Sequence, residues 1–263
     1  MDTISIMLLA IIVFMAGASI ASFSGLVYFR LKTIPAEAGI LKTISAPRSH
    51  CENCKETLRA VDLIPILGWV LTKGRCRHCH HPVPVRYPFT EALLGAVSVA
   101  FAWAFFPDIQ TTILVLGLIW SLVVISAIDL SINIIPDELT TPLLFLGLLM
   151  SPFEASMELK VAGAAFGWFM LHMSMWVLQA WKGREGGNGG DAAMGALIGA
   201  WFGIFATPIY LFAFCVFYAL HAGGLRKTRE DGAPCGPAFS AAIIAVMPFH
   251  QFIGLIYGQV PQF

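Results

Sequence analysis

The sequence has few charged residues. Aspartate, glutamate, lysine and arginine make up 12% of its 263 residues, whereas 57% are hydrophobic. A soluble domain carries roughly 25% charged residues, so this composition excludes an ordinary soluble domain. Long apolar runs recur along the chain and predict an all-α polytopic membrane protein in a lipid bilayer. The net charge of +0 gives no overall basic excess, so no nucleic-acid partner is expected.

Basic residues are also missing ahead of the first apolar run, residues 4–28. Among the three residues that precede it, only Asp2 has a charged side chain, and that charge is negative. A secretory signal peptide would need a basic start and a shorter apolar core. We therefore expect this run to be a retained first transmembrane helix.

The chain shows no soluble linker, low-complexity tract or internal repeat. Three regions are predicted: a first transmembrane helix at 1–29, a polar cytoplasmic domain at 30–87 and a transmembrane domain at 88–263. About eight transmembrane helices are expected, at residues 4–28, 88–106, 111–128, 139–152, 159–180, 193–205, 206–222 and 238–257.

The distribution of basic residues predicts the orientation in the membrane. With the N-terminus outside, the cytoplasmic segments are 29–87, 129–138, 181–192 and 223–237. Of the 16 lysines and arginines, only Lys160 falls outside these segments. Because cytoplasmic loops are enriched in lysine and arginine, this orientation is favoured.

Four of the six cysteines form two C-x-x-C pairs in the polar segment: Cys51, Cys54, Cys76 and Cys79. Two such pairs can supply four thiolates around one zinc ion. Disulfides are the alternative, but a cytoplasmic domain lies in a reducing compartment. A redox C-x-x-C pair is a second alternative, though it belongs to a βαβ fold with one pair. The spacing therefore predicts a structural zinc site.

Two aspartates lie at the ends of apolar segments on the same predicted side of the membrane. Asp129 ends one segment and Asp191 precedes another. Two carboxylates brought close share a proton, so one can activate water while the other acts as an acid. Helix capping is the alternative for either residue. The pair is our candidate catalytic site.

Glycine is concentrated just before Asp191. Asn188, Gly189 and Gly190 form a candidate substrate loop, because glycine and asparagine tolerate backbone conformations that exclude most residues. Further glycines recur at helical spacing and predict close helix packing. They are Gly163 and Gly167 in one segment, and Gly195, Gly199 and Gly203 in another.

The order of these motifs resembles type IV prepilin peptidases, also called prepilin leader peptidase/N-methyltransferases, which are GxGD-type intramembrane aspartyl proteases. The resemblance covers nearly the whole chain. It rests on Ala21-Ser22-Phe23, Tyr28-Phe29-Arg30-Leu31, Arg48, the four cysteines, Asp62 to Pro65, Gly74 to Arg77, Arg86-Tyr87-Pro88, Glu91, Ile128-Asp129, Ile135 to Glu138, Gly183 to Gly186, Gly190-Asp191, Gly199 to Gly203 and Pro234 to Pro237.

The resemblance implies an activity and a location. Asp129 and Asp191 would be the catalytic aspartates of an endopeptidase in the bacterial inner membrane, with its active site facing the cytoplasm. Its substrates would be type IV prepilins or type II secretion pseudopilins, cleaved after a glycine. Many members then N-methylate the new amino terminus, which adds S-adenosylmethionine as a candidate second cofactor.

Three departures from the family pattern accompany the resemblance. Asn188 stands where a glycine is expected, Ala193 where lysine is common, and Ser24-Gly25 where a Leu-Asn pair is expected. A catalytically altered homologue therefore stays open as an alternative. So does a membrane transporter or scaffold whose aspartates only cap helices. The sequence leaves the particular pilin, the methyl-donor site and the oligomeric state undetermined.

Overall fold

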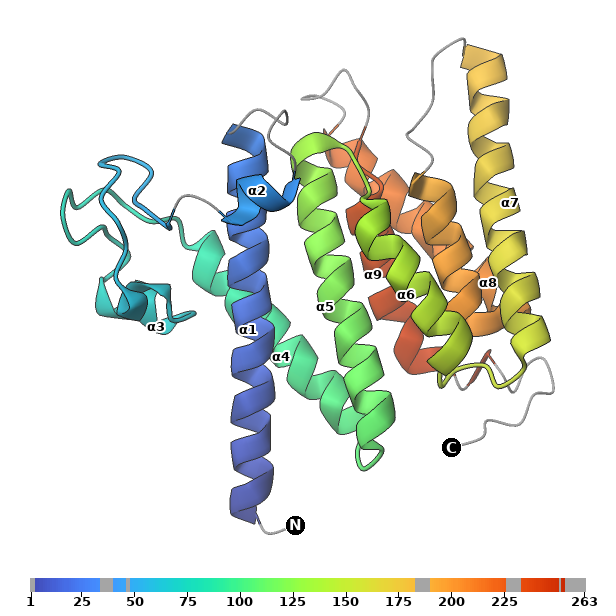
Figure 1. The fold of residues 1–263 in the computed structure, drawn as a ribbon, viewed down its shortest axis with the longest axis horizontal. Helices are drawn as coiled ribbons and strands as arrows, with labels where there is room; N and C mark the ends of the chain where they lie inside the picture. The colour runs from blue at the N-terminus through green and yellow to red at the C-terminus, as the bar shows by residue number, and fades with distance from the viewer. Residues whose placement is uncertain are drawn as a thin grey trace. The chain divides into compact units, whose positions relative to one another are not determined.

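The structure, a computed structural model, describes residues 3–33, 40–45, 48–182, 190–225, 233–250 and 252–253. These residues form helices and no β-strand, which confirms the all-α prediction (Figure 1). The elements are α1 (Thr3–Thr33), α2 (Ile40–Ser45), η2 (Ala60–Leu63), α3 (Leu67–Leu71), α4 (Arg86–Phe105), α5 (Ile109–Ile132), α6 (Asp137–Met150), α7 (Met157–Lys182), α8 (Gly190–Leu225), α9 (Gly236–Val246) and η3 (Met247–Phe249). They fall into two compact units, Met1–Thr112 and Ile113–Phe263.

In the first unit, α1 and α4 pack together through small residues. A Cβ atom added to Gly95 of α4 would lie 2.8 Å from the Phe14 ring, and one added to Gly17 of α1 would lie 2.8 Å from the Leu94 carbonyl oxygen. Small residues let helix backbones approach closely where lipid offers no hydrophobic drive for association. The polar segment between these helices carries the four cysteines.

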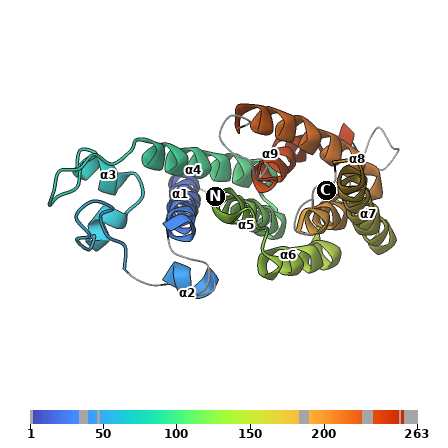
Figure 2. The ribbon, with the colours of Figure 1, turned by 90° about the horizontal axis from the view of Figure 1, so that it is seen from above.

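In the second unit, α7 and α8 lie side by side (Figure 1, Figure 2). A Cβ on Gly163 would lie 2.8 Å from the Gly199 carbonyl oxygen, and Gly167 and Gly195 meet in the same way one turn further along. The glycine spacing in the sequence is therefore confirmed as a helix-packing device.

Gly199→Ala is expected to lower the stability of the protein by about 1–3 kcal/mol, because overpacking at a tight contact forces backbones apart. An added methyl group would strike the backbone of Gly163. Gly117→Ala in α5 is the matched control, since nothing lies within 4 Å of its added Cβ. Thermal unfolding in detergent measures both variants. Equal melting temperatures for the two would contradict the packing assigned to Gly199.

The chain doubles back within α8 at Gly203, whose backbone leaves the helical region (φ 74°, ψ 170°). Positions eight apart in a straight helix are separated by about 12 Å along the axis. The rings of Phe202 and Tyr210 instead stack with centroids 4.1 Å apart. Gly203 takes this conformation because positive φ costs glycine little. The two halves of α8 correspond to the expected spans 193–205 and 206–222.

A buried polar cluster lies beside Gly203. Lys160 is 5% exposed, and its Nζ donates to the carbonyl oxygens of Leu148 and Ser151, where α6 ends. Glu154 is also buried and interacts electrostatically with Lys160. A buried cation of this kind is satisfied by carbonyls at a helix C-terminus, whose dipole is negative. This explains why one lysine falls outside the expected cytoplasmic segments.

Five helices in the described ranges are long and apolar enough to cross a membrane, so the protein is a multi-pass membrane protein: α1, α4, α5, α7 up to Trp181, and α8 from Gly190 to Gly223. Helix α8 is counted once here, although its backbone breaks at Gly203. The expected count of eight is not confirmed. Helices α6 and α9 have 14 and 11 residues, fewer than the roughly 20 that span a bilayer.

Candidate functional site

The Asp129 carboxylate is buried at the last turn of α5, with 3% of the residue exposed. Its Oδ2 accepts a hydrogen bond of 2.6 Å from the backbone N–H of Gly236, the first residue of α9. N–H groups at a helix start have no partner within the helix, and the dipole there favours negative charge. The start of α9 therefore stabilises Asp129 as a carboxylate.

Asp191 lies in the first turn of α8 and joins the same site. Its side chain interacts electrostatically with Asp129 and forms a hydrogen bond with the Cys235 side chain. Gly190, just before it, packs on Ile135, since an added Cβ would lie 2.8 Å from the Ile135 Cβ. A larger residue at 190 would therefore collide with Ile135. The structure thus brings together the two aspartates that the sequence singled out.

Cys235 is the site residue to which sequence reasoning assigned no role. Burial raises the pKa of its thiol, and the nearby carboxylates of Asp191 and Asp129 raise that pKa further. A raised pKa favours the neutral thiol over the more nucleophilic thiolate. The only signal of Cys235 in the sequence was the motif Pro234-Cys235-Gly236-Pro237, noted for resemblance alone.

The candidate substrate loop is only partly placed. Gly190 belongs to α8. Asn188 and Gly189 lie outside the described residues. Their expected contribution to substrate binding stays a prediction.

The two C-x-x-C pairs form matching turns in the first unit. In each turn, the N–H of the first cysteine donates to a carbonyl five residues on, over 2.9 Å in both cases (Glu56 and His81). The residue before that carbonyl has a positive φ, 61° at Lys55 and 55° at His80. Isolated β-bridges, His50 with Thr57 and Arg75 with Pro82, close the two turns. Each turn therefore aims its thiols to one side.

The four sulfur atoms converge within 4.8 Å of one another. The Sγ atoms of Cys51 and Cys79 are 3.8 Å apart, and those of Cys54 and Cys76 are 3.9 Å apart. A tetrahedral zinc ion with Zn–S bonds of about 2.3 Å needs sulfurs about 3.8 Å apart. The donor set and its spacing therefore fit a metal ion and are compatible with zinc.

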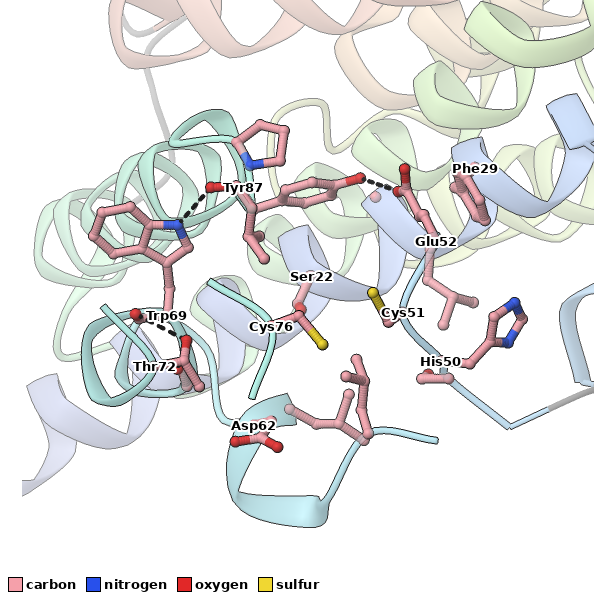
Figure 3. Close-up of a pocket in the computed structure, with 18 of the residues that line it drawn as sticks. Ser22, Phe29, His50, Cys51, Glu52, Asp62, Trp69, Thr72, Cys76 and Tyr87 are labelled. Carbon is pink, nitrogen blue, oxygen red and sulfur yellow. Dashed lines mark hydrogen bonds between the residues drawn. The ribbon is translucent and has the colours of Figure 1, made fainter. Parts of the chain in front are cut away.

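A pocket of about 560 Å³ lies between this cysteine segment, the end of α1 and the start of α4 (Figure 3). Aromatic side chains line it, and the Tyr87 hydroxyl donates a 3.3 Å hydrogen bond to Glu52. Glu91 also lines it and is buried, with Oε2 accepting a 2.7 Å hydrogen bond from the N–H of Ile66. Gly25, one of the departures from the family pattern, faces Tyr87 in this pocket.

The sequence matches two family models, the bacterial peptidase A24 N-terminal domain over residues 15–105 and the type IV leader peptidase family over residues 116–223. It is similar to proteins named prepilin leader peptidase/N-methyltransferase. The match from Dichelobacter nodosus is 31% identical over 217 residues, 82% of this chain and 76% of the relative. The match from Aeromonas hydrophila is 36% identical over 205 residues, which are 76% of this chain and 70% of the relative. No solved structure gives a significant match.

Proposed function

The chain belongs to the type IV leader peptidase family, and from this we propose that it removes the short leader of type IV prepilins or type II secretion pseudopilins. Cleavage follows a glycine at the cytoplasmic face of the bacterial inner membrane. The names of the relatives support prepilin processing. The observation that carries the proposal is that Asp129 and Asp191, each at the end of a helix, bond to the neighbouring residues Gly236 and Cys235 and interact electrostatically.

The surroundings of the two aspartates favour different roles in hydrolysis. Asp129 is held as a carboxylate by the Gly236 N–H, so it accepts a proton from the attacking water. Asp191 carries the shared proton and donates it to the carbonyl oxygen of the scissile bond, because two close carboxylates do not ionise together. The pair titrates as a unit. The leaving amine then takes up the proton that Asp129 received, and collapse of the resulting diol to the carboxylic acid returns a proton to Asp191.

A cleavage assay tests the proposal directly. The purified protein in lipid or detergent is mixed with a prepilin and, separately, with a pseudopilin. The masses of the products are measured by mass spectrometry. We expect loss of the leader at a glycine. An intact mass for every substrate would overturn the proposal and favour the altered homologue, with Asn188 as the first residue to restore to glycine.

Zinc is the metal that we assign to the cysteine cluster. Four thiolates leave no open coordination position, which is typical of structural rather than catalytic zinc. The ion would hold together a segment that has little apolar core of its own. Cys51, Cys54, Cys76 and Cys79 are its ligands in this proposal.

N-methylation of the new amino terminus is a second activity that we assign to this chain, since its relatives are named N-methyltransferases. The pocket of about 560 Å³ in the first unit supports it. Small-molecule sites range over roughly 300–1,000 Å³ and are mostly apolar with a few polar groups. S-adenosylmethionine would supply an electrophilic methyl group when bound. The rings of Trp69 and Tyr87 would stack on it, and the Glu91 carboxylate would attract its positive charge.

Gly25→Phe is expected to weaken binding of S-adenosylmethionine by tenfold or more, because the ring would occupy the pocket beside Tyr87. Filling part of the site removes contacts between the ligand and the protein. A tenfold loss of affinity corresponds to a loss of about 1.4 kcal/mol of binding free energy. Ser19→Phe is the matched control, since Ser19 is exposed on α1 and does not line the pocket. Calorimetric titration measures both. Unchanged affinity in Gly25→Phe would place the methyl donor elsewhere.

A further inference from the structure

The cysteine segment is polar in overall composition, but part of its surface is apolar. Large apolar side chains are exposed across η2, α3 and the turn between them: Val61, Leu63, Ile64, Leu67, Val70 and Leu71. Val70 and Leu71 are 55% and 58% exposed. An exposed apolar cluster of this kind marks a site of interaction with a protein or a membrane. We call these side chains the apolar tip.

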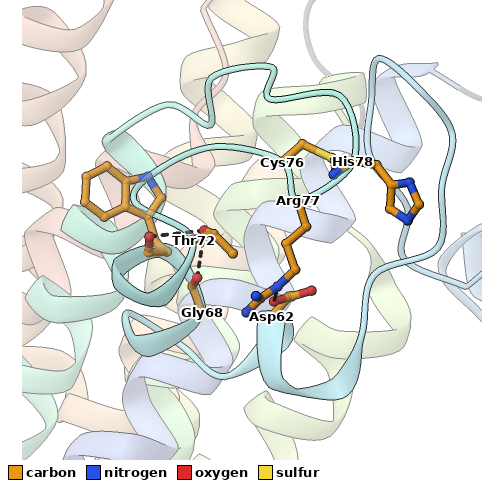
Figure 4. Close-up of polar contacts among 7 residues, drawn as sticks. Asp62, Gly68, Thr72, Cys76, Arg77 and His78 are labelled. Atoms are coloured by element: carbon orange, nitrogen blue, oxygen red, sulfur yellow. Dashed lines mark hydrogen bonds and ion pairs between the residues drawn. The ribbon is translucent and has the colours of Figure 1, made fainter.

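The apolar tip is held facing outward by contacts on its inner side (Figure 3, Figure 4). The Trp69 Nε1 donates a 3.0 Å hydrogen bond to the Val83 carbonyl oxygen, and the indole packs on Gly74. Asp62 forms a 2.7 Å ion pair with Arg77, next to the zinc ligand Cys76. Two of the tip residues, Leu63 and Ile64, also line the pocket on this inner side, whereas Val61, Leu67, Val70 and Leu71 do not line it and are exposed.

The backbone under the tip is also strained. Ile66, which precedes α3, has φ 63°, a region that β-branched residues rarely adopt. Its N–H donates to the buried Glu91 of α4. Such a conformation persists only where surrounding contacts impose it, and often at functional positions. Glu91 therefore fixes α3 against the second turn of α4.

This attachment sets the depth of the apolar tip relative to the membrane. Helix α4 is one of the spans, and an exposed stripe begins just before it and runs along it, at Val85, Phe89 and Leu93. Glu91 lies within that stripe's length, so the tip continues an apolar surface that already faces lipid.

Exposed basic residues border the apolar tip. Arg59 precedes η2, Lys73 follows α3, and Arg86 opens α4. An apolar face bordered by lysine and arginine is typical of segments that lie in the headgroup region of anionic bilayers. The border therefore favours lipid over a protein partner as the occupant.

We propose that the apolar tip, residues 61–71, is inserted into the cytoplasmic leaflet, so that the zinc domain is a membrane-seated element and not a freely soluble one. Its partner is a bilayer containing anionic lipid. The insertion would hold the pocket between α1 and the cysteine segment at a constant depth. It makes no use of the aspartate site, so it stands or falls independently of the proposed peptidase activity.

The test measures depth at single positions in the full-length protein. A fluorescent noncanonical amino acid is placed at Val70, the protein is reconstituted into vesicles containing phosphatidylglycerol, and quenching by brominated lipid is recorded. Leu93 on α4 is the lipid-exposed reference, and Glu56 in the first cysteine turn is the water-exposed control. Zinc content of each variant confirms that the domain is folded.

We expect the probe at Val70 to be quenched about as strongly as the probe at Leu93, and the probe at Glu56 to be quenched little. Quenching at Val70 as weak as at Glu56 would overturn the proposal. A probe at Val70 that becomes shielded only when prepilin is added would also overturn it, because the tip would then be a protein-binding surface. A photo-crosslinking amino acid at Leu71 separates the same two outcomes. Adducts with lipid would support insertion into the bilayer, and adducts with protein alone would overturn it.

Discussion

Replacement of Asp129 by asparagine is expected to lower the rate of leader cleavage by about 10⁴-fold or more, the loss typical of removing an essential catalytic group. The amide has nearly the shape of the carboxylate but cannot accept a proton from water. Asp191→Asn is expected to have a similar effect, because the pair then has no acidic proton to give to the carbonyl oxygen. The two losses should not add, since the aspartates act as one unit.

The control for these variants is Asp108→Asn. Asp108 caps the start of α5, where its side chain accepts hydrogen bonds from Thr111, and asparagine caps a helix about equally well. Mass spectrometry of prepilin over a time course measures all three variants. If Asp129→Asn or Asp191→Asn cleaves at the wild-type rate while its melting temperature is unchanged, that residue is not catalytic. Helix capping would then be its role.

Loss of one cysteine of the cluster is expected to abolish metal binding and unfold the segment around it. Structural zinc binds with an apparent free energy on the order of 10 kcal/mol, which in a small domain is most of the folding energy. Cys76→Ser removes one of the four thiolates that converge within 4.8 Å. We expect one zinc per chain in the wild type and none in this variant, with new proteolytic cleavage between residues 48 and 85.

Cys215→Ser is the matched control for that variant. Cys215 is an exposed cysteine of α8 and does not belong to the cluster. Zinc content by elemental analysis and limited proteolysis compare the two proteins. Full zinc occupancy in Cys76→Ser, or loss of zinc from Cys215→Ser, would contradict the assignment of the ligands.

Much of the fold is predictable from local patterns in the sequence. Long apolar runs locate the helices, because backbone groups inside a bilayer must be satisfied within a helix. The spacing of the two C-x-x-C pairs indicates a metal site, because each pair closes a turn within a few residues. Glycines at four-residue intervals predict close helix packing, because that interval places them on one helix face; the structure decides that the two glycine faces, on α7 and α8, meet each other.

Other features were decided by tertiary structure. Cys235 and Gly236 stand out in the sequence only as part of a motif shared with the family, yet the Gly236 N–H bonds to Asp129 across 107 residues of sequence. The spacing of glycines predicts a packing role for Gly203, whereas the structure makes it the point where α8 doubles back. The sequence predicts a polar segment at residues 30–87, whereas the structure leaves Val61, Leu67, Val70 and Leu71 within it exposed on the surface.

The sequence by itself determined which residues are candidates for chemistry and where the long apolar helices lie, because both depend on residue type and short-range spacing. Only the tertiary structure decided that Asp129 is held at the start of α9, next to Asp191 and the Cys235 thiol. It also decided which apolar side chains remain on the surface. Both outcomes depend on how distant segments pack, and neither a period nor a motif within one segment specifies that packing.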